Sequence, residues 1–183
     1  MDTLIHPSSM DADRDVGIRA AQARAVERMQ ADPGLARSTT ATTGVIRDGL
    51  ACHISQGKFT AVSDLGRGMG GDAAGPSPSF YARAAIAGCV AIAIKMHAAN
   101  EGRAFRQVEV TVETDMYDLA LFGIGSQSAA PLLTDISIAI DSDEEPGVVA
   151  PIVKTALARD PWYLALRDRQ VVTTTLQQIQ THG

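Results

Sequence analysis

The sequence predicts an α+β fold in which a mostly antiparallel sheet packs on a central buried helix. Residues 75–100 form one long stretch in which Ala, Ile, Val and Met fall on every side, as in a helix that protein surrounds. Residues 38–65, 106–118 and 134–143 carry the β-branched or alternating patterns of strands. The resulting order of strands, helix, strands, helix and strand is typical of the α+β class.

The composition indicates one domain with few aromatic side chains in its core. The chain has 183 residues, and only four Phe, three Tyr and one Trp supply aromatic bulk. A core made mainly of Ala, Val and Ile buries less apolar area per residue, so burial against a second subunit is favoured. We therefore expect a homodimer.

The charge and the start of the chain restrict the partner and the compartment. The net charge is −5 and the pI is about 5.3, so we expect neither nucleic acid nor an anionic membrane as partner. The start of the chain has no basic segment followed by an apolar one, so we expect no secretory signal. We expect a cytoplasmic protein whose two cysteines, which lack CxxC spacing, are free thiols.

The first expected element is a helix at residues 10–31, which are rich in Ala, Arg and Glu. Acidic residues in its first turn suit a helix N-terminus. Its apolar face is thin, so we expect an appended arm rather than part of the core. The segment 32–34, Asp-Pro-Gly, ends this helix. We assign residues 1–37 to an N-terminal helical extension and residues 38–183 to the main domain.

A three-stranded meander is expected next, at residues 38–65. These residues are rich in Thr and Val, and the turn signals Arg-Asp-Gly and Gln-Gly divide them into three short strands. In the second strand Cys52 and His53 are neighbours, so their side chains point to opposite faces. Residues 66–78 are rich in glycine, which predicts a loop.

The central helix is expected at residues 75–100, with Cys89 in its middle. At about 100° per residue the thiol shares a face with Ala and Ile, which predicts small, tightly packed apolar surroundings. Gly88 and the alanines would let another helix approach closely. Arg83 and Lys95 leave only eleven uncharged residues between them, fewer than the roughly 20 that a bilayer span needs. We therefore expect the core helix of a soluble protein.

The second half of the chain adds two strands, a second long helix and a last strand. Alternation of Val, and then of Ile, predicts strands at residues 106–118 and 134–143. Residues 146–159 predict an amphipathic helix after a run of acidic residues, and an Asp-Pro step interrupts it at 160–161. A further helical turn follows, and the β-branched residues 170–179 predict a closing strand.

Two interpretations of Cys89 follow from the residues alone. A lone cysteine in a buried, Ala-rich helix is commonly a small apolar side chain. A reactive thiolate instead needs a nearby cation, because burial alone raises the pKa of a thiol. Arg47 and Arg67 could come from elsewhere in the fold. Arg83 lies about 120° round the same helix and cannot easily reach the sulfur.

The sequence carries no pattern typical of a cofactor or metal site. The glycine loop lacks the dinucleotide fingerprint and the Lys-Ser/Thr step of a phosphate loop. A zinc site from Cys52, His53, Cys89 and His97 is disfavoured, because adjacent strand residues point apart. A nucleophile pair of Cys89 and His97 is unsupported as well, since the two lie about 12 Å apart along the helix axis.

Residues 75–98, GPSPSFYARAAIAGCVAIAIKMHA, resemble the central-helix signature of the OsmC/Ohr family. The order of elements from about residue 39 to residue 179 matches as well. The resemblance implies an intertwined homodimer in which two sheets wrap the central helices, with active sites at the subunit interface. It further implies that Cys89 is the peroxidatic cysteine and that Arg47, in the turn T-G-x-x-R-D-G, is the arginine that activates it.

The sequence departs from the family pattern at two positions. The glutamate that fixes the arginine would fall ten residues before the cysteine, where this chain has Ser79. The second, resolving cysteine of the family lies in a Cys-Pro step, which aligns with Asp160 and Pro161. Either an external thiol therefore resolves Cys89, or this is a divergent member that binds rather than reduces.

The resemblance implies one function, and two alternatives stay open beside it. The expected function is thiol-dependent reduction of organic hydroperoxides by Cys89, without a cofactor and with an external thiol as reductant. Apolar residues around Cys89 favour alkyl hydroperoxides over hydrogen peroxide. The first alternative is a catalytically divergent protein that binds a small apolar ligand at the dimer interface. The second is a structural dimer whose N-terminal arm contacts another partner.

Overall fold

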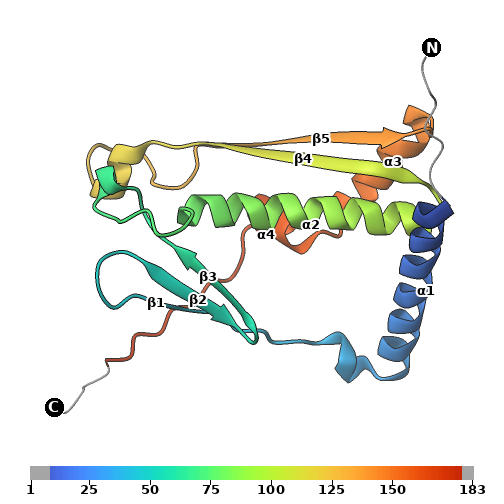
Figure 1. Cartoon of the computed structure of the whole chain (residues 1–183), viewed down its shortest axis with the longest axis horizontal. Helices are drawn as coiled ribbons and strands as arrows, with labels where there is room; N and C mark the ends of the chain where they lie inside the picture. Colours follow the sequence, from blue (N-terminus) through green and yellow to red (C-terminus); the bar gives the residue numbers. More distant parts are fainter. Residues whose placement is uncertain (1–8, 179–183) are drawn as a thin grey trace.

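The computed structural model describes residues 9–178, which form four α-helices and five strands (Figure 1). The helices are α1 Ser9–Ala31, α2 Pro78–Asn100, α3 Pro146–Leu157 and α4 Pro161–Arg167. The strands are β1 Thr43–Val45, β2 Cys52–Gln56, β3 Phe59–Ser63, β4 Phe105–Asp115 and β5 Leu133–Ser142. Short 3-10 turns lie in the connections at η1 Pro33–Ala36, η2 Arg67–Met69 and η3 Asp118–Phe122. The predicted α+β class and the predicted order of elements as far as α4 are confirmed.

Helix α2 is the centre of the subunit, and it begins where the sequence supplies a start signal. The Ser77 hydroxyl oxygen accepts a hydrogen bond from the Phe80 amide at 3.2 Å, and Pro78 occupies the first turn, where its missing N–H costs nothing. In Figure 1 the β4–β5 ribbon runs along one side of α2, and β1–β3 lies beside the N-terminal end of the helix. Helices α3 and α4 pack against α2 as well.

Sheet β4–β5 packs its apolar face on α2. The antiparallel register places Val108 opposite Ile140 and Val110 opposite Ile138, and these four side chains pack against the buried core. The intervening Glu and Thr side chains face outward, which confirms that the alternating pattern gives this strand one solvent-exposed face. The buried core residues are Val90, Ile94, Ala98, Phe105, Ile152 and Ala156.

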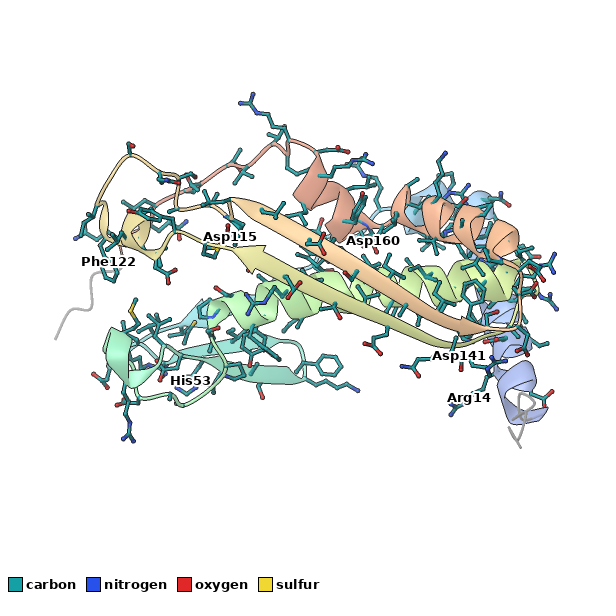
Figure 2. All side chains as sticks on the ribbon, turned by 90° about the horizontal axis from the view of Figure 1, so that it is seen from above. Arg14, His53, Asp115, Phe122, Asp141 and Asp160 are labelled. Atoms are coloured by element: carbon teal, nitrogen blue, oxygen red, sulfur yellow. The ribbon has the colours of Figure 1, made fainter. Side chains whose placement is uncertain are left out.

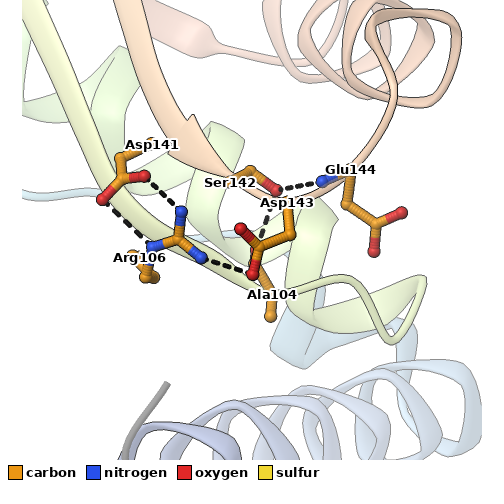
Figure 3. A network of polar contacts seen from close by, with 6 residues as sticks. All are labelled: Ala104, Arg106, Asp141, Ser142, Asp143 and Glu144. Carbon is orange, nitrogen blue, oxygen red and sulfur yellow. Dashed lines mark hydrogen bonds and ion pairs between the residues drawn. The ribbon is translucent and has the colours of Figure 1, made fainter. Parts of the chain in front are cut away.

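Ion pairs and hydrogen bonds link β4 to β5 at the end near α3 (Figure 3). Arg106 on β4 donates to both carboxylate oxygens of Asp141 and to Asp143. Beside it, the Ser142 hydroxyl donates to the Ala104 carbonyl at 2.9 Å. The hydrogen bond with Arg106 holds the pKa of Asp141 below its ordinary value, and the two acids raise the pKa of Arg106. The pair of Arg106 and Asp141 therefore stays ionised at neutral pH.

Strands β1, β2 and β3 form a separate antiparallel meander in that order, as predicted. Asp64, directly after β3, is buried. Its carboxylate accepts hydrogen bonds from the amides of Leu65 at 2.7 Å and of Asp72 and Ala74 at 3.0 Å each. The Ala74 bond contributes most to holding the pKa of Asp64 below its ordinary value, and burial opposes it. These bonds fix the glycine-rich loop that leads into α2.

Two glycines let this loop lie directly against the backbone of β3 and of the residues that follow β3. A Cβ atom at Gly71 would lie 2.1 Å from the Leu65 carbonyl oxygen, and one at Gly75 would lie 2.1 Å from the Val62 carbonyl oxygen. No other residue type fits at such a distance from backbone. The loop prediction is confirmed, with the short turn η2 as its one regular segment.

Helix α1 forms the arm that the sequence predicts, and it contacts the C-terminal end of α2. The Lys95 ammonium donates to the Asp15 carboxylate at 2.9 Å and to the Phe105 carbonyl at 2.6 Å. The Asn100 amide donates to Gln22 at 2.7 Å. Figure 1 shows α1 standing roughly across the end of α2. The division of the chain after residue 37 stays a prediction.

The predicted closing strand at residues 170–179 is wrong for the part that the structure describes. Residues 168–178 form no helix or strand, and Val171, Val172 and Leu176 are 95, 81 and 95% exposed. Residue 179 lies outside the described residues. A β-branched composition favours extended backbone, but a strand also needs a neighbour that accepts its ladder hydrogen bonds. This segment has no such neighbour among residues 9–178.

Helix α2 is buried on one side only, so the expectation that protein surrounds it is wrong for the single chain. Its buried residues are Val90, Ile94, Ala98 and Ala99. On the other face Ile92 is 62% exposed, and nothing lies within 4 Å of a Cβ placed at Gly88. Among the described helices α2 is long and apolar enough to cross a membrane by length and composition. This alone does not indicate a membrane protein, because β4–β5, α3 and α4 pack on it.

Candidate functional site

Cys89 lies in the middle of α2 and is partly buried. Helix α4 packs on α2, and the Asp160 side chain that caps α4 and the Trp162 backbone are near enough to Cys89 to affect the pKa of its thiol. The surroundings of the thiol are therefore not made of small apolar side chains alone, as the sequence predicted. The sequence prediction considered only residues of the same helix.

Asp160 caps α4 and has no exposed surface. Its Oδ1 accepts a hydrogen bond from the Tyr163 amide at 2.7 Å, and Pro161 fills the first helical position. Its Oδ2 has no hydrogen-bond partner of normal geometry within residues 9–178. Figure 2 shows Asp160 at the junction of α3 and α4, on the side of α2 away from the three-stranded sheet.

The surroundings of Cys89 favour its protonated form in the single subunit. Burial raises the pKa of the thiol most, and the Asp160 carboxylate raises it further. The Trp162 amide opposes them by favouring the thiolate. No arginine in the described part of the chain is among the groups that act on this pKa. Within one subunit, Cys89 therefore rests as a thiol at neutral pH.

The three candidate arginines lie in different places. Arg47 follows β1 and lines a shallow hollow on the exposed sheet together with His53 and Val62. Arg67 begins η2 in the glycine loop. Arg83 donates to the Thr114 hydroxyl on β4 at 3.1 Å. Within one chain none of them is among the groups that affect the pKa of Cys89, so the predicted pair of Cys89 and Arg47 stays a prediction.

The second cysteine and the histidines do not join Cys89. Cys52 is a free thiol on β2 that lies against Gly44 on β1, and His53 points to the opposite, exposed face, as predicted. No three His, Cys, Asp or Glu side chains in the described residues are placed to share a metal ion. The zinc alternative therefore has no geometric support. Burial lowers the pKa of His97, and the charge of Arg159 lowers it further.

An apolar groove lies between β5, α3 and α4, close to the start of α4. It has a volume of about 650 Å³. Its lining includes Leu132, Ile136, Ile138, Leu157, Tyr163 and Leu166. A second hollow of about 560 Å³ shares Ile138 and Leu157 and continues toward α3. Tyr163, which lines this groove, also donates its amide to Asp160.

A family profile described as OsmC-like protein matches residues 70–175, which include α2, both long strands, α3 and α4. This chain belongs to the OsmC-like family. The resemblance that the central helix suggested is thereby confirmed. No curated protein matches the chain.

Solved structures of OsmC-like proteins share this fold at low identity. An OsmC-like protein from Mycoplasma pneumoniae has 12% identity and a TM-score of 0.61, over 71% of this chain and 88% of that one. A putative osmotic stress induced and detoxification response protein from Psychrobacter arcticus has 14% identity and a TM-score of 0.56, over 70% and 89%. A putative organic hydroperoxide resistance protein from Vibrio cholerae, with captopril in one of its active sites, has 19% identity and a TM-score of 0.52, over 72% and 87%.

The nearness of Asp160 to Cys89 is the part of the site that sequence reasoning missed. An Asp-Pro step after a helix signals a new N-cap, and the sequence could have supplied that signal. It could not supply the nearness to Cys89, because that depends on how α4 packs on α2.

Proposed function

We propose that this OsmC-like protein is a thiol-dependent peroxidase that reduces organic hydroperoxides through Cys89. The observation that carries the proposal is the position of Cys89, which lies in the middle of the central helix of an OsmC-like fold and is only partly buried. A small peroxide can approach a sulfur that is partly exposed. The Vibrio cholerae neighbour, which is named for organic hydroperoxide resistance, supports the same class of substrate.

The proposed reaction needs a cation that a second subunit would bring. The bare face of α2 around Gly88 and Ile92 is suited to a second copy, because exposed apolar side chains and an open glycine permit close packing. Arg47 lies on the meander β1–β3, which stands apart from the core of its own subunit. We propose that Arg47 of the partner subunit reaches Cys89 in a cytoplasmic homodimer, stabilises the thiolate and orients the peroxide.

The chemistry consumes one peroxide and two external thiols. The Cys89 thiolate attacks one peroxide oxygen, the O–O bond breaks, and the alkoxide takes up a proton and leaves as an alcohol. Cys89 becomes a sulfenic acid. One low-molecular-weight thiol then forms a mixed disulfide with Cys89 and releases water. A second thiol attacks this disulfide, restores Cys89 and leaves as an external disulfide.

A non-catalytic binding function is the alternative, and two observations favour it. The pKa of Cys89 is raised in the single subunit, which suits a lining residue better than a nucleophile. The groove beside α4 is large and mainly apolar, with a volume of about 650 Å³, as is usual for sites that hold small molecules. In this case the ligand would be small and apolar.

One assay separates the two functions. The purified protein is given cumene hydroperoxide and dithiothreitol, and peroxide consumption is followed in the wild type, Cys89→Ser and Cys52→Ser. A peroxidase loses activity in Cys89→Ser and keeps it in the matched control Cys52→Ser. Equal, background consumption by all three proteins, together with a ligand that copurifies with the wild type, would instead support the binding function.

A further inference from the structure

Asp160 has a second carboxyl oxygen that its structural role does not use. As the N-cap of α4 it uses only Oδ1, which accepts the Tyr163 amide. Asn or Ser would cap the helix about as well without placing a carboxylate in the interior. Burial of a carboxylate oxygen without a hydrogen bond is unfavourable. Asp160 has no exposed surface, and its Oδ2 has no partner in the described residues, so a capping role alone does not explain it.

The unpartnered oxygen of Asp160 lies at the start of α4, which packs on the helix that carries Cys89. Helix α4 packs against α2, and Asp160 is close enough to Cys89 to be among the groups that raise the pKa of the thiol. The resting thiol offers only a weak S–H donor. A sulfenic acid would place an O–H group on the same sulfur, and an O–H is a much stronger donor to a carboxylate.

We propose that Asp160 Oδ2 accepts a hydrogen bond from the sulfenic acid of Cys89 and thereby keeps that acid in its protonated form. This inference rests on the proposed peroxidase function, since it concerns the product of the first step. It assigns to Asp160 a role in place of the resolving cysteine that the family pattern has at this position. A hydrogen bond stabilises the sulfenic acid, and no internal disulfide forms.

The consequence is protection of Cys89 from further oxidation. In that side reaction the sulfur of the sulfenic acid attacks a second hydroperoxide, the O–O bond breaks, an alcohol leaves, and a sulfinic acid remains, which thiols do not reduce. The deprotonated sulfenate is the stronger nucleophile in this step. A neighbouring carboxylate disfavours a second negative charge, so Asp160 slows the second oxidation while an external thiol can still reduce the first product.

The test compares the wild type with Asp160→Asn, which keeps the cap and replaces the free acceptor by an N–H donor. Each protein receives one equivalent of cumene hydroperoxide without thiol, and then a stepwise excess. Intact mass and dimedone labelling report the protein with one added oxygen, and intact mass reports the protein with two. The matched control is Asp32→Asn, because Asp32 also caps a turn, by accepting the Gly34 amide at 3.0 Å, but is exposed.

We expect Asp160→Asn to shorten the lifetime of the singly oxidised protein several-fold and to form the doubly oxidised protein at a lower peroxide excess. The control should behave as the wild type does. Asp160→Ser, a shorter cap without charge, should repeat the effect, and thermal unfolding of each variant shows that it is folded. Thiols added later should restore less Cys89 in the Asp160 variants than in the wild type.

Two different results would overturn the inference, and they can be told apart. If the wild type takes up one oxygen and both Asp160 variants over-oxidise at its rate, Asp160 has no such role and the peroxidase proposal stands. If the wild type takes up no oxygen at Cys89, the peroxidase proposal fails and the inference fails with it.

Discussion

The β4–β5 sheet and the β1–β3 sheet differ in how they are packed within one subunit. Phe105 at the start of β4 is fully buried against α2 and α3, whereas Phe59 at the start of β3 is 69% exposed. The first sheet completes a hydrophobic layer with the helices of its own chain. The second leaves apolar side chains in solvent, and it carries Arg47. The difference indicates that one half of the subunit folds around its own core and the other half is suited to an interface.

Matched substitutions of one phenylalanine in each sheet test this difference, and they give the largest expected effect. Phe105→Ala should lower the free energy of unfolding by about 3–5 kcal/mol, because it removes a buried ring and leaves a cavity. Phe59→Ala should cost within about 0.5 kcal/mol, as exposed positions commonly do. Urea denaturation of both variants measures the two values. A cost at Phe59 as large as that at Phe105 would show that Phe59 is buried in the native protein.

The bare face of α2 gives the next prediction, which concerns assembly. Ile92→Glu places a charge on the exposed stripe of the helix, and it should convert a dimer to a monomer because a buried unpaired charge is strongly unfavourable. Analytical ultracentrifugation measures the mass. Val16→Glu is the control, because Val16 is 55% exposed on α1, outside this face. A dimer that survives Ile92→Glu would locate the interface elsewhere.

The smallest expected effect is a shift in the reactivity of Cys89. Thiolate, not thiol, reacts with iodoacetamide, so the midpoint of the alkylation rate against pH reports the pKa of Cys89. Burial and Asp160 raise this pKa within one subunit, and a nearby arginine of the partner would lower it. The midpoint should therefore move to higher pH in Arg47→Met and in monomeric Ile92→Glu, so that alkylation at neutral pH slows in both.

The control for this experiment is Arg67→Met, which removes the other candidate arginine. It should leave the alkylation midpoint where the wild type has it. A midpoint unchanged by Arg47→Met, but moved by Arg67→Met, would assign the activating role to the glycine loop instead.

Local patterns predicted the elements that pack within one chain. The alternation of Val and Ile fixes which face of β4 and β5 meets α2, and the serine and proline at residues 77–78 mark the start of that helix. Each of these signals lies within a few neighbouring residues. The family membership also followed from one stretch, because the signature around Cys89 is contiguous.

The features that depend on another molecule or on distant packing were not predictable in this way. The segment around Val171 has the composition of a strand but no partner in the subunit. The polar side of the Cys89 site arises because α4, some seventy residues later in the chain, places Asp160 against α2. Sequence spacing gives the face of a helix, but it does not give which side chain of another helix will meet that face.

The loop before α2 has a consequence for protein engineering. Backbone carbonyl oxygens occupy the space that any side chain at Gly71 or Gly75 would need. A library that randomises residues 66–75 should therefore return glycine at these two sites among folded clones and accept wide variation at Gly66 and Gly68, around which a Cβ finds open space. Side chains of a chosen chemistry could thus be introduced at Gly66 and Gly68, provided that Gly71 and Gly75 are kept and that Gly70, with its positive φ, stays glycine.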